Sequence, residues 1–176
     1  MKRITLILCA ACAILLASCG GPNREQSIKE IEQCENLLMS DAAMAGIDMN
    51  KATEMVTLYK EFVHNFPNDS LAPIFLYKAA DISYNTNHVD SAIALFSRIT
   101  EEYEDFAELG TCYFMIGEGY NTLGKFEEAQ AAYENFVRLF PDHPLAADTR
   151  YLLENKMIGM SPEQALEMIL ANKEDQ

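Results

Sequence analysis

The sequence has few basic residues. Thirteen Lys and Arg side chains stand against 27 Asp and Glu, so the formal net charge at pH 7 is −14. A protein that binds a phosphate backbone or an anionic lipid surface needs positive charge to do so. The composition therefore predicts that neither nucleic acid nor an anionic membrane surface is a partner.

Motifs for metal binding and catalysis are also missing. The three histidines, His64, His88 and His143, have no second ligand at helical or Cys-x-x-Cys spacing, so we expect no metal site. No Ser/His/Asp or Cys/His set stands within a motif, and no glycine-rich phosphate loop follows a strand pattern. We expect no enzyme, no cofactor and no small-molecule substrate.

The most apolar stretch lies at the start of the chain. Two basic residues precede Ile4–Leu16, which is too short to span a bilayer as a stable helix. The stretch ends in Leu16-Ala17-Ser18-Cys19, which resembles the lipobox of bacterial lipoproteins. The resemblance implies that residues 1–18 are a signal peptide and that lipid, such as palmitate, is attached to Cys19. An ordinary secretory signal is the alternative.

Cleavage after residue 18 would leave 158 residues with a net charge of −16. Residues 19–26 are then predicted to be a lipidated tether of at most roughly 25 Å, at about 3.4 Å per residue. Gly20 replaces the aspartate that resembles an inner-membrane retention signal, and the tether has no acidic cluster like that of surface-exported lipoproteins. We expect a lipid anchor in the outer membrane, with the folded part facing the periplasm.

A block of residues recurs in the rest of the chain. Its members Tyr59, Phe62, Phe66, Pro67, Leu71 and Ala72 return 74 residues later as Tyr133, Phe136, Phe140, Pro141, Leu145 and Ala146. A degraded copy lies halfway, at Phe96, Ile99 and Tyr103. A fixed period of this size is typical of stacked supersecondary units.

Residues 110–143 form the clearest unit. Large residues stand at its positions 4, 7, 11 and 24, small residues at 8 and 20, and proline at 32: Tyr113, Ile116, Tyr120, Tyr133, Gly117, Ala129 and Pro141. This pattern resembles the tetratricopeptide repeat (TPR), a pair of antiparallel helices. We expect Gly117 and Ala129 to be small because the two helices cross there, and Pro141 to end the second helix.

Two further units are predicted at about 36–69 and 73–106, and a capping hairpin at 145–172, within a TPR domain spanning 27–176. The second unit has Ser83 at the position of the aromatic and Glu104 at that of the proline. Ser161 and Pro162 are expected to open the last helix. The predicted fold is all-α, a TPR-type α-solenoid of about eight antiparallel helices in four helix-turn-helix hairpins.

The spacing of 37 residues between units, with the segments Asn65–Ala72 and Leu139–Ala146, resembles a particular group of proteins. These are the TPR lipoproteins associated with outer-membrane protein assembly (BamD-like) and with the Tol-Pal envelope system (YbgF-like). They are non-enzymatic envelope scaffolds, so the resemblance implies a scaffold or adaptor. BamD-like proteins generally carry five repeats, and this chain is shorter.

In TPR arrays the first helix of each hairpin lines a concave face. The matching positions give the partner-binding candidates Tyr77, Lys78, Asp81, Tyr84, Asn85, Phe114, Glu118 and Asn121. Aromatic area with amide and charged groups suits a peptide groove. The alternative is that the aromatic residues Tyr77, Tyr84 and Phe114 only pack between neighbouring helices, which helical spacing does not decide.

Three functions follow from these features. The first is an adaptor that binds an envelope protein or peptide segment through the groove. The second is a structural subunit of an outer-membrane assembly or Tol-Pal-like complex, docked by its convex or terminal faces. The third, an enzyme or glycan-handling protein, lacks a catalytic set.

Two smaller features remain. Cys34 and Cys112 fall in different units and are expected to be free buried thiols. Asp69-Ser70-Leu71 and Asp90-Ser91-Ala92 resemble O-glycosylation acceptors of Bacteroidota envelope proteins, although helix N-capping is the favoured interpretation.

Overall fold

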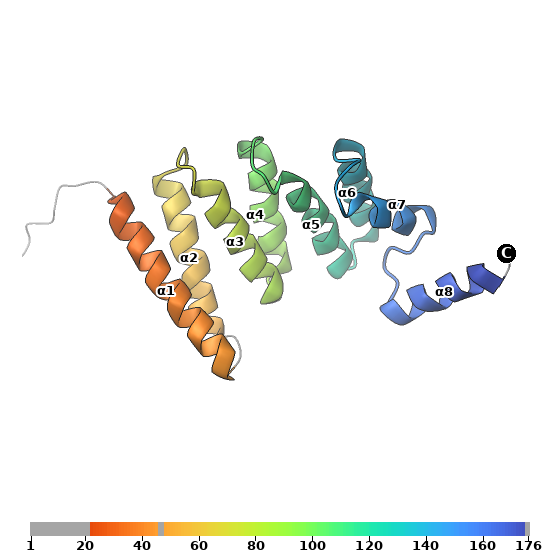
Figure 1. Ribbon diagram of the computed structural model, residues 1–176, viewed down its shortest axis with the longest axis horizontal. Coiled ribbons are helices and arrows are strands. Elements are labelled where there is room, and N and C mark those ends of the chain that lie inside the picture. Colours follow the sequence, from red (N-terminus) through yellow and green to blue (C-terminus); the bar gives the residue numbers. More distant parts are fainter. Residues whose placement is uncertain (1–21, 46–47, 175–176) are drawn as a thin grey trace, which may run out of the picture.

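The structure is a computed structural model that describes residues 22–45 and 48–174. Within these ranges it is entirely helical. Its elements are α1 (Arg24–Ala45), α2 (Met49–Asn65), α3 (Ala72–Asn85), α4 (Val89–Glu102), α5 (Leu109–Thr122), α6 (Phe126–Leu139), α7 (Ala146–Glu154) and α8 (Pro162–Glu174). The helices α1 to α7 follow one another side by side along the long axis (Figure 1). The predicted all-α solenoid of TPR type is confirmed.

The core is built between helices that are neighbours in sequence. Each helix from α1 to α6 packs against the next one. The largest buried side chains recur at the predicted spacing: Phe62 of α2, Phe96 of α4, and Tyr133 and Phe136 of α6 are all 2% exposed or less. Apolar side chains that meet in this way bury their surface with little loop-closure cost, because the contacts are local.

The turns between successive hairpins repeat one geometry. Phe66, Tyr103 and Phe140 end α2, α4 and α6 with nearly equal backbone angles, φ −134°, −135° and −127° and ψ 59°, 65° and 61°. Each carbonyl then accepts a hydrogen bond from the N–H three residues later, over 3.0, 3.1 and 3.1 Å. Glu104 follows Tyr103 where the other two turns have proline, so the proline is not needed for this turn.

The first hairpin is longer than predicted. The sequence predicts its first helix from about Ser27 to Ala45; helix α1 begins at Arg24 instead, so residues 24–26 of the predicted tether are helical. The side chain of Asn23 accepts a hydrogen bond from the N–H of Gln26. The guanidinium of Arg24 binds the carboxylate of Asp69 through two hydrogen bonds, of 2.5 and 3.1 Å. These contacts extend α1 towards its N-terminus.

The last two helices do not form the predicted capping hairpin. No close packing joins α8 to α7 or to another described helix, and α8 points away from the stack (Figure 1). The intervening segment turns at Lys156 and Gly159, both with positive φ. It folds back onto α5, where the N–H of Gly159 donates to Asn121 Oδ1 over 3.0 Å.

Helix starts confirm one expectation and correct another. Ser161 and Gln164 form a reciprocal cap on α8, since Ser161 Oγ accepts from the N–H of Gln164 and Gln164 Oε1 from the N–H of Ser161. The N-caps of α3 and α4 are instead Leu71 and His88, without side-chain cap bonds. The predicted capping by the two Asp-Ser pairs is therefore wrong, and Asp69 instead accepts from the N–H of Leu71 within the turn.

Cys19 and residues 1–18 lie outside the described residues. Among the helices that are described, none combines the length and the apolar character needed to cross a bilayer. Cys34 and Cys112 are buried and free, as expected.

Candidate functional site: the face of α3 and α5

Two of the predicted groove aromatics pack within the stack. The ring of Tyr77 meets Phe96 at a centroid distance of 5.7 Å and Phe106 at 5.9 Å. Phe114 lies 5.8 Å from Tyr133 and 5.6 Å from Phe136. Both side chains are half-buried, and burial raises the pKa of Tyr77. They are part of the packing between helices and offer only their outer parts to a partner.

Lys78 connects α3 with α1. Its ammonium lies 2.7 Å from Glu35 Oε1, which also accepts a hydrogen bond of 2.5 Å from the Tyr59 hydroxyl. Burial alone would raise the pKa of Glu35, but the hydrogen bonds from Lys78 and Tyr59 outweigh it and lower that pKa. The Lys78 ammonium also stands 5.9 Å from the centres of the Tyr59 and Phe75 rings. Its position is therefore fixed by several contacts.

Polar side chains also connect α3 with α5. The hydroxyl of Tyr84 lies 2.9 Å from Thr122 Oγ1, at hydrogen-bond distance. Within the third hairpin, Glu118 accepts a hydrogen bond from the Tyr133 hydroxyl, and burial followed by this bond raises the pKa of Tyr133. Asn121 holds the segment after α7 through the N–H of Gly159. Side-chain contacts thus link α1 to α3, through Glu35 and Lys78, and α3 to α5, through Tyr84 and Thr122.

Asp81 and Asn85 are exposed, as is Lys78. The amide of Asn85 donates to the carbonyl of Asp81 one turn earlier, over 2.9 Å. The carboxylate of Asp81 faces solvent. A chain of fixed polar groups beside partly covered rings can supply apolar contact and hydrogen bonds to a bound segment.

The sequence prediction missed two groups on this face. Glu35 lies outside the repeat register because α1 is longer than the first helix of a regular unit, and Gly159 lies in an irregular segment. No periodic signal marks either of them. Among the described His, Cys, Asp and Glu side chains, no group of three is placed to hold a metal ion.

Two hollows lie away from this face. One, of about 900 Å³, is at the edge between the turn after α2 and the turn after α4, where Ile74 and Tyr103 form part of its wall. The other, of about 440 Å³, lies beside α2 and the junction of α3 with α4, over Ser83. The eight partner-binding candidates line neither of them, although Ile74 stands at a further predicted groove position of the second unit.

Comparison with known proteins adds one match. The family described as tetratricopeptide repeat matches residues 110–143, which are the predicted third unit and cover α5, apart from its first residue, and α6. No curated protein matches the chain in sequence. The helical stack and this match define the chain as a TPR-containing α-solenoid, a fold that typically serves as a non-enzymatic scaffold. Such domains generally bind other proteins.

Proposed function

We propose that this chain is a lipid-anchored TPR adaptor of the bacterial envelope. It binds a segment of another envelope protein along the face formed by α3 and α5. The observation that carries this proposal is the continuity of that face, in which Lys78 reaches Glu35 of α1 and Tyr84 reaches Thr122 of α5. A binding surface whose side chains are already ordered loses less conformational entropy when a partner is bound.

The charge of the face indicates what the segment carries. Asp81 is exposed, and Glu35 and Glu118 lie in the same face, each held as an acceptor. Negative potential at a docking surface favours a partner with basic side chains and speeds its association. The bound segment is therefore apolar with at least one Lys or Arg that meets Asp81.

The anchor places this face near a membrane. Only Gly20–Asn23 separate Cys19 from the first residue of α1. That linker spans at most roughly 14 Å at about 3.4 Å per residue. An adaptor with acyl chains on Cys19 would hold its stack against the bilayer, in our proposal the periplasmic face of the outer membrane. The partner would then be a membrane protein or a protein held close to the same surface.

A capture experiment tests the proposal. The two exposed carboxylates Asp81, on the face, and Asp142, in the turn after α6, give a matched pair of charge reversals. Asp81→Lys should abolish capture of the envelope partner by the purified chain, and Asp142→Lys should leave it intact. Equal capture by both variants would overturn the proposed binding face. Alanine at Tyr77 or Phe114 is unsuitable, since these rings support the packing.

The end of the stack favours a second candidate function. Leu166 and Leu170 of α8 are 56% and 52% exposed, although they stand on one side of the helix. An apolar side that no other described part of the chain covers suits docking into a larger complex. Under this alternative, Leu166→Glu with Leu170→Glu would remove the chain from the complex, whereas Asp81→Lys would not.

A further inference from the structure

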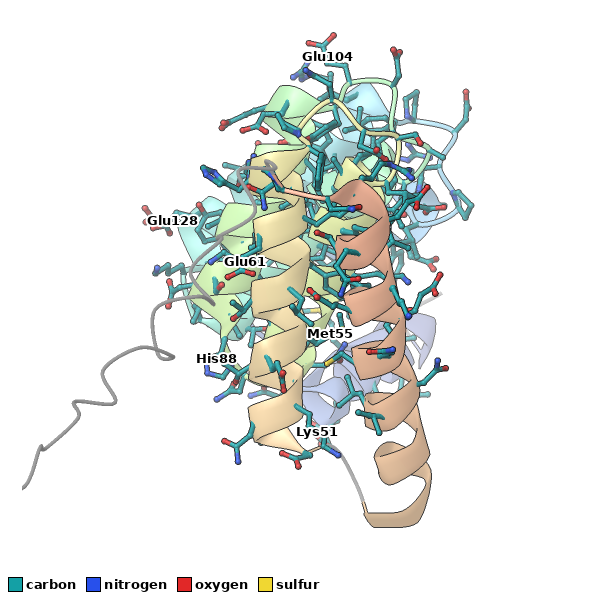
Figure 2. All side chains as sticks on the ribbon, turned by 90° about the vertical axis from the view of Figure 1, so that its left-hand side faces the viewer. Lys51, Met55, Glu61, His88, Glu104 and Glu128 are labelled. Carbon is teal, nitrogen blue, oxygen red and sulfur yellow. The ribbon has the colours of Figure 1, made fainter. Side chains whose placement is uncertain are left out.

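The hollow beside α2 lies where the second repeat lacks an aromatic ring. Ser83 and Thr86, at the end of α3, form its floor, and Ala52 and Val56 of α2 form one wall. Lys60, His64 and His88 stand at its polar rim. Glu61 and His88, both lining residues, lie on the same flank of the molecule, beside α2 (Figure 2).

Comparison of the repeats explains the hollow. A shift by one period of 37 residues brings each lining residue onto its counterpart beside α4. At the floor and at the wall formed by α2 the counterparts are all larger: Ala52 corresponds to Val89, Val56 to Ile93, Ser83 to Tyr120 and Thr86 to Leu123. The second repeat thus has smaller side chains at these four positions around the hollow. The largest difference is the aromatic ring, which Tyr120 has and Ser83 lacks.

Exchanges in the opposite direction also occur without closing the hollow, and one of them is next to its floor. Ile82 corresponds to Gly119, at which an added Cβ would lie 2.5 Å from Ile93 Cγ1. The second repeat has the larger Ile82 at this position, and its side chain is partly buried against the core. Ser83, next along the helix, still leaves about 440 Å³ above it.

The chemistry of the floor is apolar. The hydroxyl of Ser83 is satisfied, because Oγ donates to the carbonyl of Ala79 over 2.7 Å. Thr86 Oγ1 likewise donates to the carbonyl of Ile82, over 2.7 Å. Because both hydroxyl groups already have hydrogen-bond partners, the floor does not require a polar ligand. The groups that can bond to a ligand are at the rim. An aromatic side chain with an apolar body and a polar tip matches this arrangement.

We propose that this hollow is a second docking site, which receives one tyrosine or phenylalanine side chain from a segment of a partner protein. The ring takes the place that Tyr120 holds in the third repeat. The rim residues then contact the tyrosine hydroxyl and the backbone of the segment. The site uses α2 and the α3–α4 junction, and it is separate from the face of α3 and α5.

The first test uses N-acetyl-tyrosine amide as the probe and the full-length chain. Addition of the probe should shift the backbone amide NMR signals of residues 52–61 and 83–91, in the millimolar range because one ring supplies little binding energy. N-acetyl-alanine amide, the matched control, should leave them unchanged. Absence of shifts with the tyrosine probe, or shifts centred elsewhere, would overturn the proposal.

The second test fills the hollow from within. Ser83→Tyr restores the repeat residue, so it should abolish the probe-induced shifts and raise the melting temperature by a few degrees. Ala131→Tyr, at an exposed position of α6, adds the same side chain elsewhere and should leave the shifts intact.

A milder pair of substitutions guards against misfolding of Ser83→Tyr. Ala52→Val with Val56→Ile copies the larger residues of the next repeat and should weaken probe binding several-fold. If Ser83→Tyr folds and binds the probe as the wild type does, the proposed site is wrong. If Ser83→Tyr does not fold, unchanged probe binding by the double variant contradicts the site in the same way.

Discussion

The ring of Tyr133 fills the space beside Gly117. A Cβ built on Gly117 would lie 2.6 Å from Tyr133 Cδ1 and equally far from Cε1, much closer than real contacts allow. Tyr133 is fully buried and its hydroxyl donates to Glu118, so the ring is not free to move away. The small residue predicted at the crossing of α5 and α6 is therefore required by a specific neighbour.

Gly117→Ala should destabilise the protein. Forcing a methyl group against a buried ring typically costs about 1–3 kcal/mol, which exceeds the gain of about 1 kcal/mol from replacing glycine within a helix. The free energy of unfolding from urea titration should fall by up to about 2 kcal/mol. In a Tyr133→Leu background the same change should cost less, because the ring is gone. An equal cost in both backgrounds would show that Tyr133 is not the obstacle.

Glu35→Gln should reduce stability at neutral pH and make it less dependent on pH. Because the folded state lowers the pKa of Glu35, the stabilisation is present above about pH 4.5, the range of an ordinary glutamate. It is lost as the pH falls through the lowered value. At pH 7 the variant should be about 1 kcal/mol less stable, since charged hydrogen bonds to Lys78 and Tyr59 are weakened.

The control for this prediction is Glu32→Gln, at an exposed position of the same helix. Urea titrations between pH 7 and pH 3 should show the gap between wild type and Glu35→Gln closing below about pH 4.5. A gap that stays constant over this range would mean that the charge of Glu35 does not stabilise the fold.

The two described cysteines should differ in reactivity. Burial raises the pKa of Cys112 to about 12, and its side chain is fully buried. The pKa of Cys34 is raised as well, mainly by burial, but this residue is 8% exposed. In N-ethylmaleimide labelling at pH 8, followed by peptide mass spectrometry, Cys34 should react first. Cys112 should react only as fast as the chain unfolds; labelling of both at one rate would contradict the described burial.

The proposed anchor predicts a specific modification. Cells fed an alkyne-tagged fatty acid should incorporate the tag into the wild-type chain and into Cys34→Ser. Cys19→Ser should remain untagged and leave the membrane fraction, because no acyl chain is then available to hold it. Tagging of Cys19→Ser would mean that the lipid, if present, is attached elsewhere.

The sequence predicted the repeat elements well because their signals are local. In the third unit Gly117 lies at the helix crossing next to the buried Tyr133. The large ring requires a small residue opposite it, so the two residue types occur together. The place where α6 ends, before Pro141, also followed from sequence, although Glu104 shows that proline is not essential to such a turn. Such positions are set by the hairpin itself and by its nearest neighbour in the stack.

Other features depended on departures from the repeat. Helix α1 begins before the expected register, so the role of Glu35 as acceptor for Lys78 could not be derived from repeat positions. The position of α8 has the same origin. This helix has the composition of a packed helix, but the positive φ values at Lys156 and Gly159 and the bond from Gly159 to Asn121 direct the preceding segment elsewhere. The hollow over Ser83 was visible in sequence only as a missing aromatic residue.

The central claim is that a partner segment binds the face of α3 and α5. Site-specific photocrosslinking in intact cells tests it most directly, with the crosslinking amino acid placed at Asp81 or, as the control, at Asp142, both exposed. We predict one discrete crosslinked envelope protein from position 81 and none from position 142. Crosslinks from position 142 or from α8, together with none from position 81, would contradict the account.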